Sequence, residues 1–105
     1  MKRKWGLTMY SRVINCQLKP DTFDQAISIW RQSIAPSLEH MPGFKGGYMT
    51  GDRHTGKGMV MTLWETQANA TAMDSSGQYQ QSILLFSDLF AVPPNREQLE
   101  VLVKV

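Results

Sequence analysis

The sequence has little cysteine, little histidine and no long apolar run, and each shortage excludes a class of protein. Its single cysteine, Cys16, cannot form an internal disulfide or a multi-cysteine metal site. The two histidines, His40 and His54, are far apart and have no carboxylates at ligand spacing, so we expect no metal and no cofactor. The longest apolar run, residues 83–86, is far shorter than the roughly 18 residues of a membrane span.

Excess positive charge is concentrated at the N-terminus. Lys2, Arg3 and Lys4 supply three of the eleven basic residues, which leaves eight basic against nine acidic residues in the remainder. Nucleic-acid binding normally needs a basic face spread over the fold, so we expect no nucleic-acid partner. We expect residues 1–6 to form a flexible tail, and because they lack the apolar block of a secretory signal we expect a cytoplasmic protein without membrane contact.

Four segments have the composition of β-strands. Residues 7–18 are rich in β-branched and aromatic side chains, and residues 44–50 and 59–64 flank a loop with Asp, Thr and Gly suited to a hairpin. Leu99, Val101, Val103 and Val105 alternate with polar residues after a predicted linker at 91–95. Gly46 and Gly47 inside the second strand predict a bulge, or a place where another backbone or a ligand comes close.

Two segments have the apolar spacing of helices. The first begins at Phe23, with either a capping box formed by Thr22 and Gln25 or Asp21 as the cap. Pro36 is expected to end or kink it, with room for a last turn over residues 37–41. The second begins near Glu65, and a break at 74–77 predicts a kink before Tyr79, Ile83, Phe86 and Phe90 repeat at helical spacing.

This order of elements predicts one domain over residues 1–105. The order β-α-β-β-α-β is typical of the ferredoxin-like α+β fold, an antiparallel sheet with both helices on one face. Most strands carry apolar residues on both faces, so the face without helices would expose a large apolar patch to water. We therefore expect a homodimer, joined through the open sheet face, that buries at least about 1,600 Å².

Short motifs near the middle of the chain resemble a known family. The residues Met41-Pro42-Gly43-Phe44, a hairpin with Asp52 and Thr55-Gly56, and Thr62-Leu63-Trp64-Glu65-Thr66 with Ala68 resemble the antibiotic-biosynthesis-monooxygenase superfamily, the dimeric α+β barrels. The similarity is sharp over residues 41–72. It implies a pocket between the sheet and the helices of one subunit.

The resemblance implies several activities and departs from two of them. Some members oxygenate aromatic polyketides and quinols without metal or flavin, and others degrade haem. Trp64 matches a tryptophan that several members place at the pocket, but Val60 and Ala70 occupy the positions of an asparagine and a tyrosine in the polyketide oxygenases. Residues 77–85 contain no histidine, which disfavours haem degradation.

Polar residues on apolar strands are the candidates for a binding site. Arg12 suits an enolate or a carboxylate, or else an interface ion pair. His40 suits a general base, or else a helix C-terminus that favours an imidazolium. The tyrosines suit packing with a hydroxyl at the rim. The candidate substrate-binding residues are Trp64, Arg12, Tyr10, Tyr48, Asn15 and His40.

Two functions remain open at this point. The first is a cofactor-independent monooxygenase acting on phenolic or quinol-like compounds, which requires a dry apolar pocket and a group that holds the substrate anion. The second is a non-catalytic protein of the same fold that binds a small apolar or aromatic molecule or only dimerises.

Overall fold

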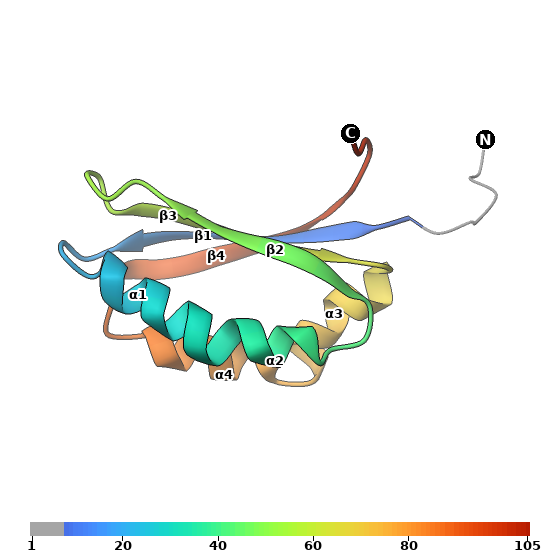
Figure 1. Ribbon diagram of the computed structural model, residues 1–105, viewed down its shortest axis with the longest axis horizontal. Helices are drawn as coiled ribbons and strands as arrows, with labels where there is room; N and C mark the ends of the chain where they lie inside the picture. Colours follow the sequence, from blue (N-terminus) through green and yellow to red (C-terminus); the bar gives the residue numbers. More distant parts are fainter. Residues whose placement is uncertain (1–7) are drawn as a thin grey trace.

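The computed structural model describes residues 8–105 (Figure 1); the predicted tail at 1–6 lies outside this range. In chain order the elements are β1 (Tyr10–Leu18), α1 (Phe23–Ile29), the π-helix η1 (Trp30–Ile34), α2 (Ala35–Glu39), β2 (Phe44–Gly51), β3 (Lys57–Trp64), α3 (Gln67–Ser75), α4 (Gln78–Phe86) and β4 (Phe90–Glu100).

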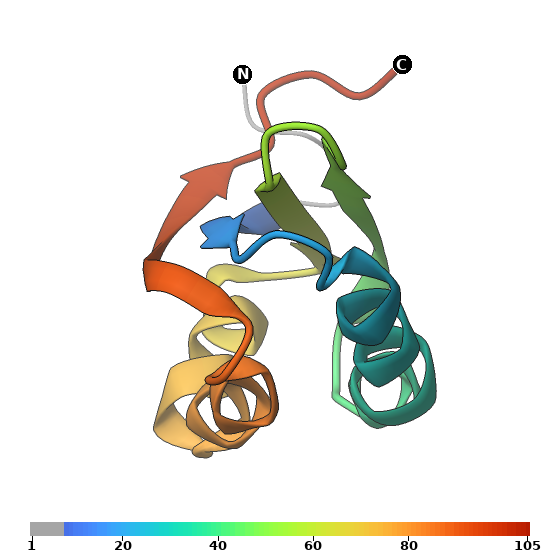
Figure 2. The ribbon, with the colours of Figure 1, turned by 90° about the vertical axis from the view of Figure 1, so that its left-hand side faces the viewer.

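The strands form one antiparallel sheet in the order β2-β3-β1-β4. Figure 2 shows the sheet end-on, with the run α1-η1-α2 and the run α3-α4 side by side on the same face. The predicted ferredoxin-like α+β fold is therefore confirmed. In the register of the two central strands Arg12 lies opposite Thr62, so side chains at even positions of β1 and β3 point toward the helices.

The first helical run does not stop at Pro36. It continues to Glu39 because η1 widens the helix just before the proline, and the N–H of Ala35 donates to the carbonyl of Trp30, five residues back. A π-turn relieves the clash that a proline ring otherwise makes with the preceding helical turn. The predicted capping box is wrong: the Thr22 hydroxyl donates to the Lys19 carbonyl at 2.8 Å and caps no backbone N–H.

The last strand is displaced from its predicted position. β4 begins at Phe90 and ends at Glu100, so the predicted linker at 91–95 belongs to the strand, and residues 101–105 lie beyond it. Pro93 and Pro94 are tolerated because β4 is an edge strand whose register against β1 shifts near Gln17.

The remaining breaks match their predictions. Gly77, with φ 81°, separates α3 from α4 at the predicted kink. Gly46, with φ 125°, occupies the register shift between β2 and β3, which confirms the predicted bulge. The core lies between the sheet and the helices, with Trp64 and Leu38 as its largest fully buried side chains. Within residues 8–105 no helix is long and apolar enough to span a membrane.

Candidate functional site

A cavity of about 80 Å³ lies between the helix-facing side of the sheet and the two helical runs. Every strand and both helical runs contribute to its wall. Apolar side chains dominate, and representative ones are Ile14, Trp30, Met49, Val60, Met73 and Phe90. The polar or titratable lining residues are Arg12, Cys16, Thr62, Tyr79 and Ser82. The cavity is therefore an apolar chamber with a few polar groups in its wall.

Among residues 8–105, Arg12 is the only charged residue that lines this cavity, and only 3% of its surface is exposed. It extends from β1 toward α3, where its Nη1 donates to Asp74 Oδ2 at 2.9 Å and its Nη2 donates to Asp74 Oδ1 at 3.3 Å. Nη1 also donates to Gln98 Oε1 at 3.1 Å. Such paired contacts fix the guanidinium plane, so the position of the charge is set before any ligand enters.

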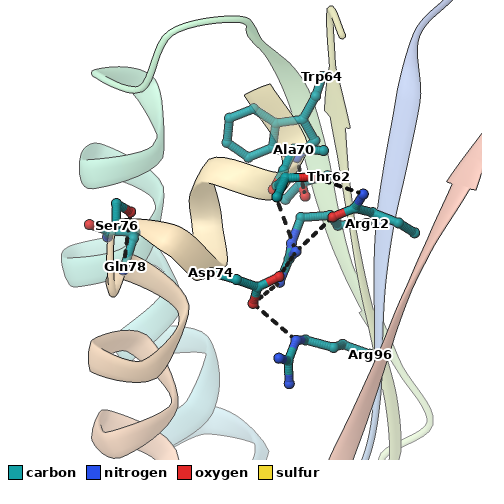
Figure 3. Close-up of polar contacts among 10 residues, drawn as sticks. Arg12, Thr62, Trp64, Ala70, Asp74, Ser76, Gln78 and Arg96 are labelled. Atoms are coloured by element: carbon teal, nitrogen blue, oxygen red, sulfur yellow. Dashed lines mark hydrogen bonds and ion pairs between the residues drawn. The ribbon is translucent and has the colours of Figure 1, made fainter. Parts of the chain in front are cut away.

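Asp74 joins two arginines from neighbouring strands (Figure 3). Besides Arg12 on β1, it contacts Nε of Arg96 on β4 at 3.0 Å. The ring of Tyr79, at the start of α4, lies 5.3 Å from the Arg12 guanidinium carbon and 4.5 Å from that of Arg96. We call these four residues the Arg12–Asp74 cluster. It ties the corner between α3 and α4 to the sheet.

The two arginines also set the protonation of Asp74. Partial burial acts to raise the pKa of its carboxyl, but hydrogen bonds from Arg12 and the charges of Arg12 and Arg96 outweigh burial and hold the pKa below its ordinary value. Asp74 is therefore a carboxylate at neutral pH.

At the cavity wall, burial raises the pKa of the Cys16 thiol above its ordinary value, while a backbone hydrogen bond with Gly58 lowers it in part. Cys16 is thus held as a neutral thiol, in keeping with a small, partly buried side chain.

The lowered pKa of Asp74 predicts a pH-dependent stability. A depressed carboxyl pKa contributes stability that is present above the unfolded pKa, near pH 4, and is lost as pH falls through the folded pKa. We expect Asp74→Asn to lower the free energy of unfolding by about 1–2 kcal/mol at pH 7. As pH falls through the folded pKa of Asp74, the wild type and Asp74→Asn should converge, because the wild-type side chain then also becomes neutral.

Urea denaturation of both proteins from pH 7 down to the most acidic pH at which the wild type still folds measures this convergence. Asp24→Asn is the matched control, because Asp24 pairs with Arg53 in an exposed contact that should contribute little to the free energy of unfolding. A gap between the wild type and Asp74→Asn that stays constant with pH would refute the assignment.

Trp64 lies next to the cavity and is not among its lining residues. Its side chain is fully buried, its ring meets Phe44 edge-on with 5.4 Å between centroids, and its Nε1 donates to the Thr62 hydroxyl at 2.8 Å. Thr62 does line the cavity. Trp64 therefore supports the cavity wall through Thr62.

The other predicted site residues do not converge on the cavity. Asn15 and Tyr48 lie on the helix-free side of the sheet, where Asn15 Nδ2 donates to Asn95 Oδ1 at 3.3 Å and Tyr48 is 63% exposed. His40 is exposed at the end of α2, and the partly buried Tyr10 packs against the core without lining the cavity. The structure brings Arg12 and Trp64 to this region and disperses the other four; a binding role for those four stays a prediction.

Sequence reasoning missed Asp74 and Tyr79 as members of the site. Asp74 falls in the Asp-Ser-Ser-Gly break, where an acidic residue is ordinary turn chemistry. Tyr79 belongs to the apolar repeat of α4 and looked like core. A usable signal was Arg12 itself, because a charged side chain within a central strand requires a carboxylate partner from an element that packs on the sheet.

Known proteins resemble this chain in three-dimensional structure rather than in sequence. No family model and no curated protein matches the chain. Solved structures do match. A "Putative antibiotic biosynthesis monooxygenase" from Bordetella bronchiseptica superimposes with a TM-score of 0.77 at 17% identity, over 91% of this chain and 99% of that one. A protein of unknown function from Nitrosomonas europaea gives a TM-score of 0.75 at 17% identity, with 93% of each chain covered.

A third structure carries a ligand. A monooxygenase from Streptomyces coelicolor in complex with the ligand nanaomycin D superimposes with a TM-score of 0.76 at 12% identity, over 93% of this chain and 91% of that one. At such identities the likeness establishes the fold and leaves the activity open. The chain has the fold of the antibiotic biosynthesis monooxygenases, in agreement with the resemblance of its central motifs.

Proposed function

We propose that this protein binds a small phenolic or quinol-like molecule in the cavity between the sheet and the helices, and oxygenates it without a cofactor. The observation that carries the proposal is the apolar cavity with one cation, Arg12, in its wall. An aromatic ring fits the apolar part, and a phenolic oxygen fits the end at Arg12. The likeness to a monooxygenase from Streptomyces coelicolor that was solved with a ligand supports this direction.

Cofactor-free oxygenation needs little from the protein beyond binding the substrate and excluding water. A deprotonated hydroquinone is rich enough in electrons to reduce dioxygen directly, and a hydroquinone plus dioxygen contains the atoms of a hydroxyquinone plus one water. A hydrogen bond from Arg12 to the phenolic oxygen would stabilise the negative charge that develops on that oxygen as the bound phenol loses its proton. The apolar wall would keep water from the reactive intermediate.

Binding without catalysis is the second candidate, and one observation favours it. None of the residues that line the cavity is a histidine, an aspartate or a glutamate, so the wall offers no ordinary general base. Deprotonation would then depend on the substrate and on Arg12 alone. A weakly acidic substrate would bind and leave unchanged.

Oxygen uptake with a panel of hydroquinones and naphthols tests the enzymatic proposal. We expect consumption above the autoxidation rate in wild type and a decrease of about tenfold or more in Arg12→Ala. Arg53→Ala, an exposed arginine in the β2–β3 loop, is the matched control and should match wild type. Val60→Trp, which fills the cavity from β3, should abolish both binding and uptake.

Each result has a defined meaning. Binding that Val60→Trp abolishes, without oxygen uptake in wild type, favours the non-catalytic candidate. Uptake that survives both Arg12→Ala and Val60→Trp would place the chemistry somewhere other than this cavity.

We also propose a homodimer joined through the helix-free face of the sheet. Large apolar side chains lie open on this face, among them Tyr48 at 63% and Leu99 at 49% exposure. A monomer rarely leaves such a face uncovered.

Light scattering should give twice the chain mass of 11.9 kDa, and Met59→Asp on this face should halve the measured mass. Leu84→Asp, on exposed α4, is the control and should stay dimeric; a wild-type monomer at micromolar concentration would contradict the proposal.

A further inference from the structure

We infer that Asp74 sets the ligand-charge preference of the cavity: by neutralising Arg12 it selects neutral hydroxyl-bearing aromatics over aromatics with a permanent negative charge. This inference rests on the proposed binding function and names its substrate class more closely. Asp74 does not line the cavity. It is a positioning residue that acts through Arg12.

The geometry of the pair supports this role. Both Nη atoms of Arg12 contact the two carboxylate oxygens of Asp74, at 2.9 and 3.3 Å, in the side-by-side arrangement that compensates charge most completely. Nη1 is occupied further by Gln98 Oε1 at 3.1 Å and by the Ala70 carbonyl at 3.5 Å. The pair therefore presents little net charge to the cavity, and its strongest donors already have acceptors.

One donor of Arg12 remains for a ligand. No acceptor among residues 8–105 contacts its Nε–H, and no fully buried side-chain nitrogen in this range lacks a partner, so Nε keeps some accessible surface on a residue that lines the cavity. A single N–H donor suits one neutral hydroxyl oxygen. A carboxylate or sulfonate would need two or more donors and would also meet the negative charge of Asp74.

Arg96 does not cancel this arrangement. Its Nε contacts Asp74 Oδ1 at 3.0 Å. The side chain of Arg96 is 44% exposed, and Arg96 does not line the cavity. Water and salt therefore screen its charge far better than they screen the Arg12–Asp74 pair. The cavity responds mainly to the inner pair.

The test compares two probes that share the naphthalene ring system by calorimetric titration. 2-Naphthol carries a neutral hydroxyl at pH 7, and 2-naphthalenesulfonate is an anion at every accessible pH. We expect wild type to prefer 2-naphthol by about tenfold or more. Asp74→Asn and Asp74→Ser leave Arg12 uncompensated, so each should bind the sulfonate about tenfold more tightly than wild type does. Asp74→Glu keeps the carboxylate and should keep the wild-type preference, and Asp24→Asn serves as the matched control.

The outcomes separate this inference from the proposed function. Wild type that binds the sulfonate as tightly as 2-naphthol would overturn the inference without any variant. Sulfonate affinity that is unchanged in both neutral variants, confirmed as folded by circular dichroism, would overturn it as well. Wild type that fails to bind 2-naphthol would count against the proposed function, whereas a gain in sulfonate affinity on neutralising Asp74 would still support the inference.

Discussion

Trp64→Ala is expected to lower the free energy of unfolding by about 3–5 kcal/mol. The side chain is fully buried, stacks edge-on against Phe44 and donates to the Thr62 hydroxyl, so the substitution removes a large apolar volume and leaves Thr62 without its partner. A domain of this size has a stability of only about 5–15 kcal/mol. The variant should therefore unfold at a much lower urea concentration than wild type.

Trp64→Phe separates the two contributions. It keeps most of the apolar volume and removes the hydrogen bond to Thr62, so it should cost about 1–2 kcal/mol. Both variants are measured by urea denaturation at one protein concentration, because dimerisation would make the midpoint concentration-dependent. A loss below about 1 kcal/mol in Trp64→Ala would contradict a structural role and return Trp64 to its predicted place as a ligand contact.

Asp74→Ala is expected to cost about 2–3 kcal/mol at pH 7. Removing the carboxylate leaves the guanidinium of Arg12 buried with 3% exposure and without its counter-charge. The cost stays below that of a fully buried pair because the side chain of Asp74 is itself 31% exposed and water can reach the vacated space. Arg96 is solvated and should lose little.

A pair of comparisons isolates the charge effect. Asp24→Ala removes an exposed contact with Arg53 and should cost less than about 1 kcal/mol. The double variant Arg12→Met/Asp74→Ala should recover part of the loss, because it removes the uncompensated charge together with its partner. Equal losses in Asp74→Ala and Asp24→Ala, or a double variant with fully additive losses, would refute the picture of a buried cation that depends on Asp74.

Period-two patterning made much of the fold predictable from sequence. Alternation within residues 7–18 groups Arg12 with Ile14 and Cys16, and alternation within residues 59–64 groups Val60 with Thr62; the structure puts all five in the cavity wall. Turn chemistry at Gly46 and Gly77 located a bulge and a helix break. Local backbone preferences and side-chain alternation act over a few residues, so one sequence suffices to infer them.

The failures have a common physical origin in tertiary context. Edge position in the sheet, which no local pattern encodes, allows Pro93 and Pro94 inside β4. The π-turn by which the helix passes Pro36 is not encoded by the local pattern either. The Arg12–Asp74 pair joins positions 62 residues apart, and the helix-free face that carries Tyr48 and Asn15 could not be distinguished from the cavity face by alternation alone. Contacts of this kind depend on packing across the sheet.

The most direct test of the central claim is a crystal structure of the protein with 2-naphthol. The account predicts the ring inside the cavity, between Trp30 of η1 and Val60 of β3, with its hydroxyl within hydrogen-bonding distance of Arg12. The Arg12–Asp74 contact should remain intact in that complex. A ligand seated on the helix-free face of the sheet, or an empty cavity at a saturating concentration of 2-naphthol, would contradict the account.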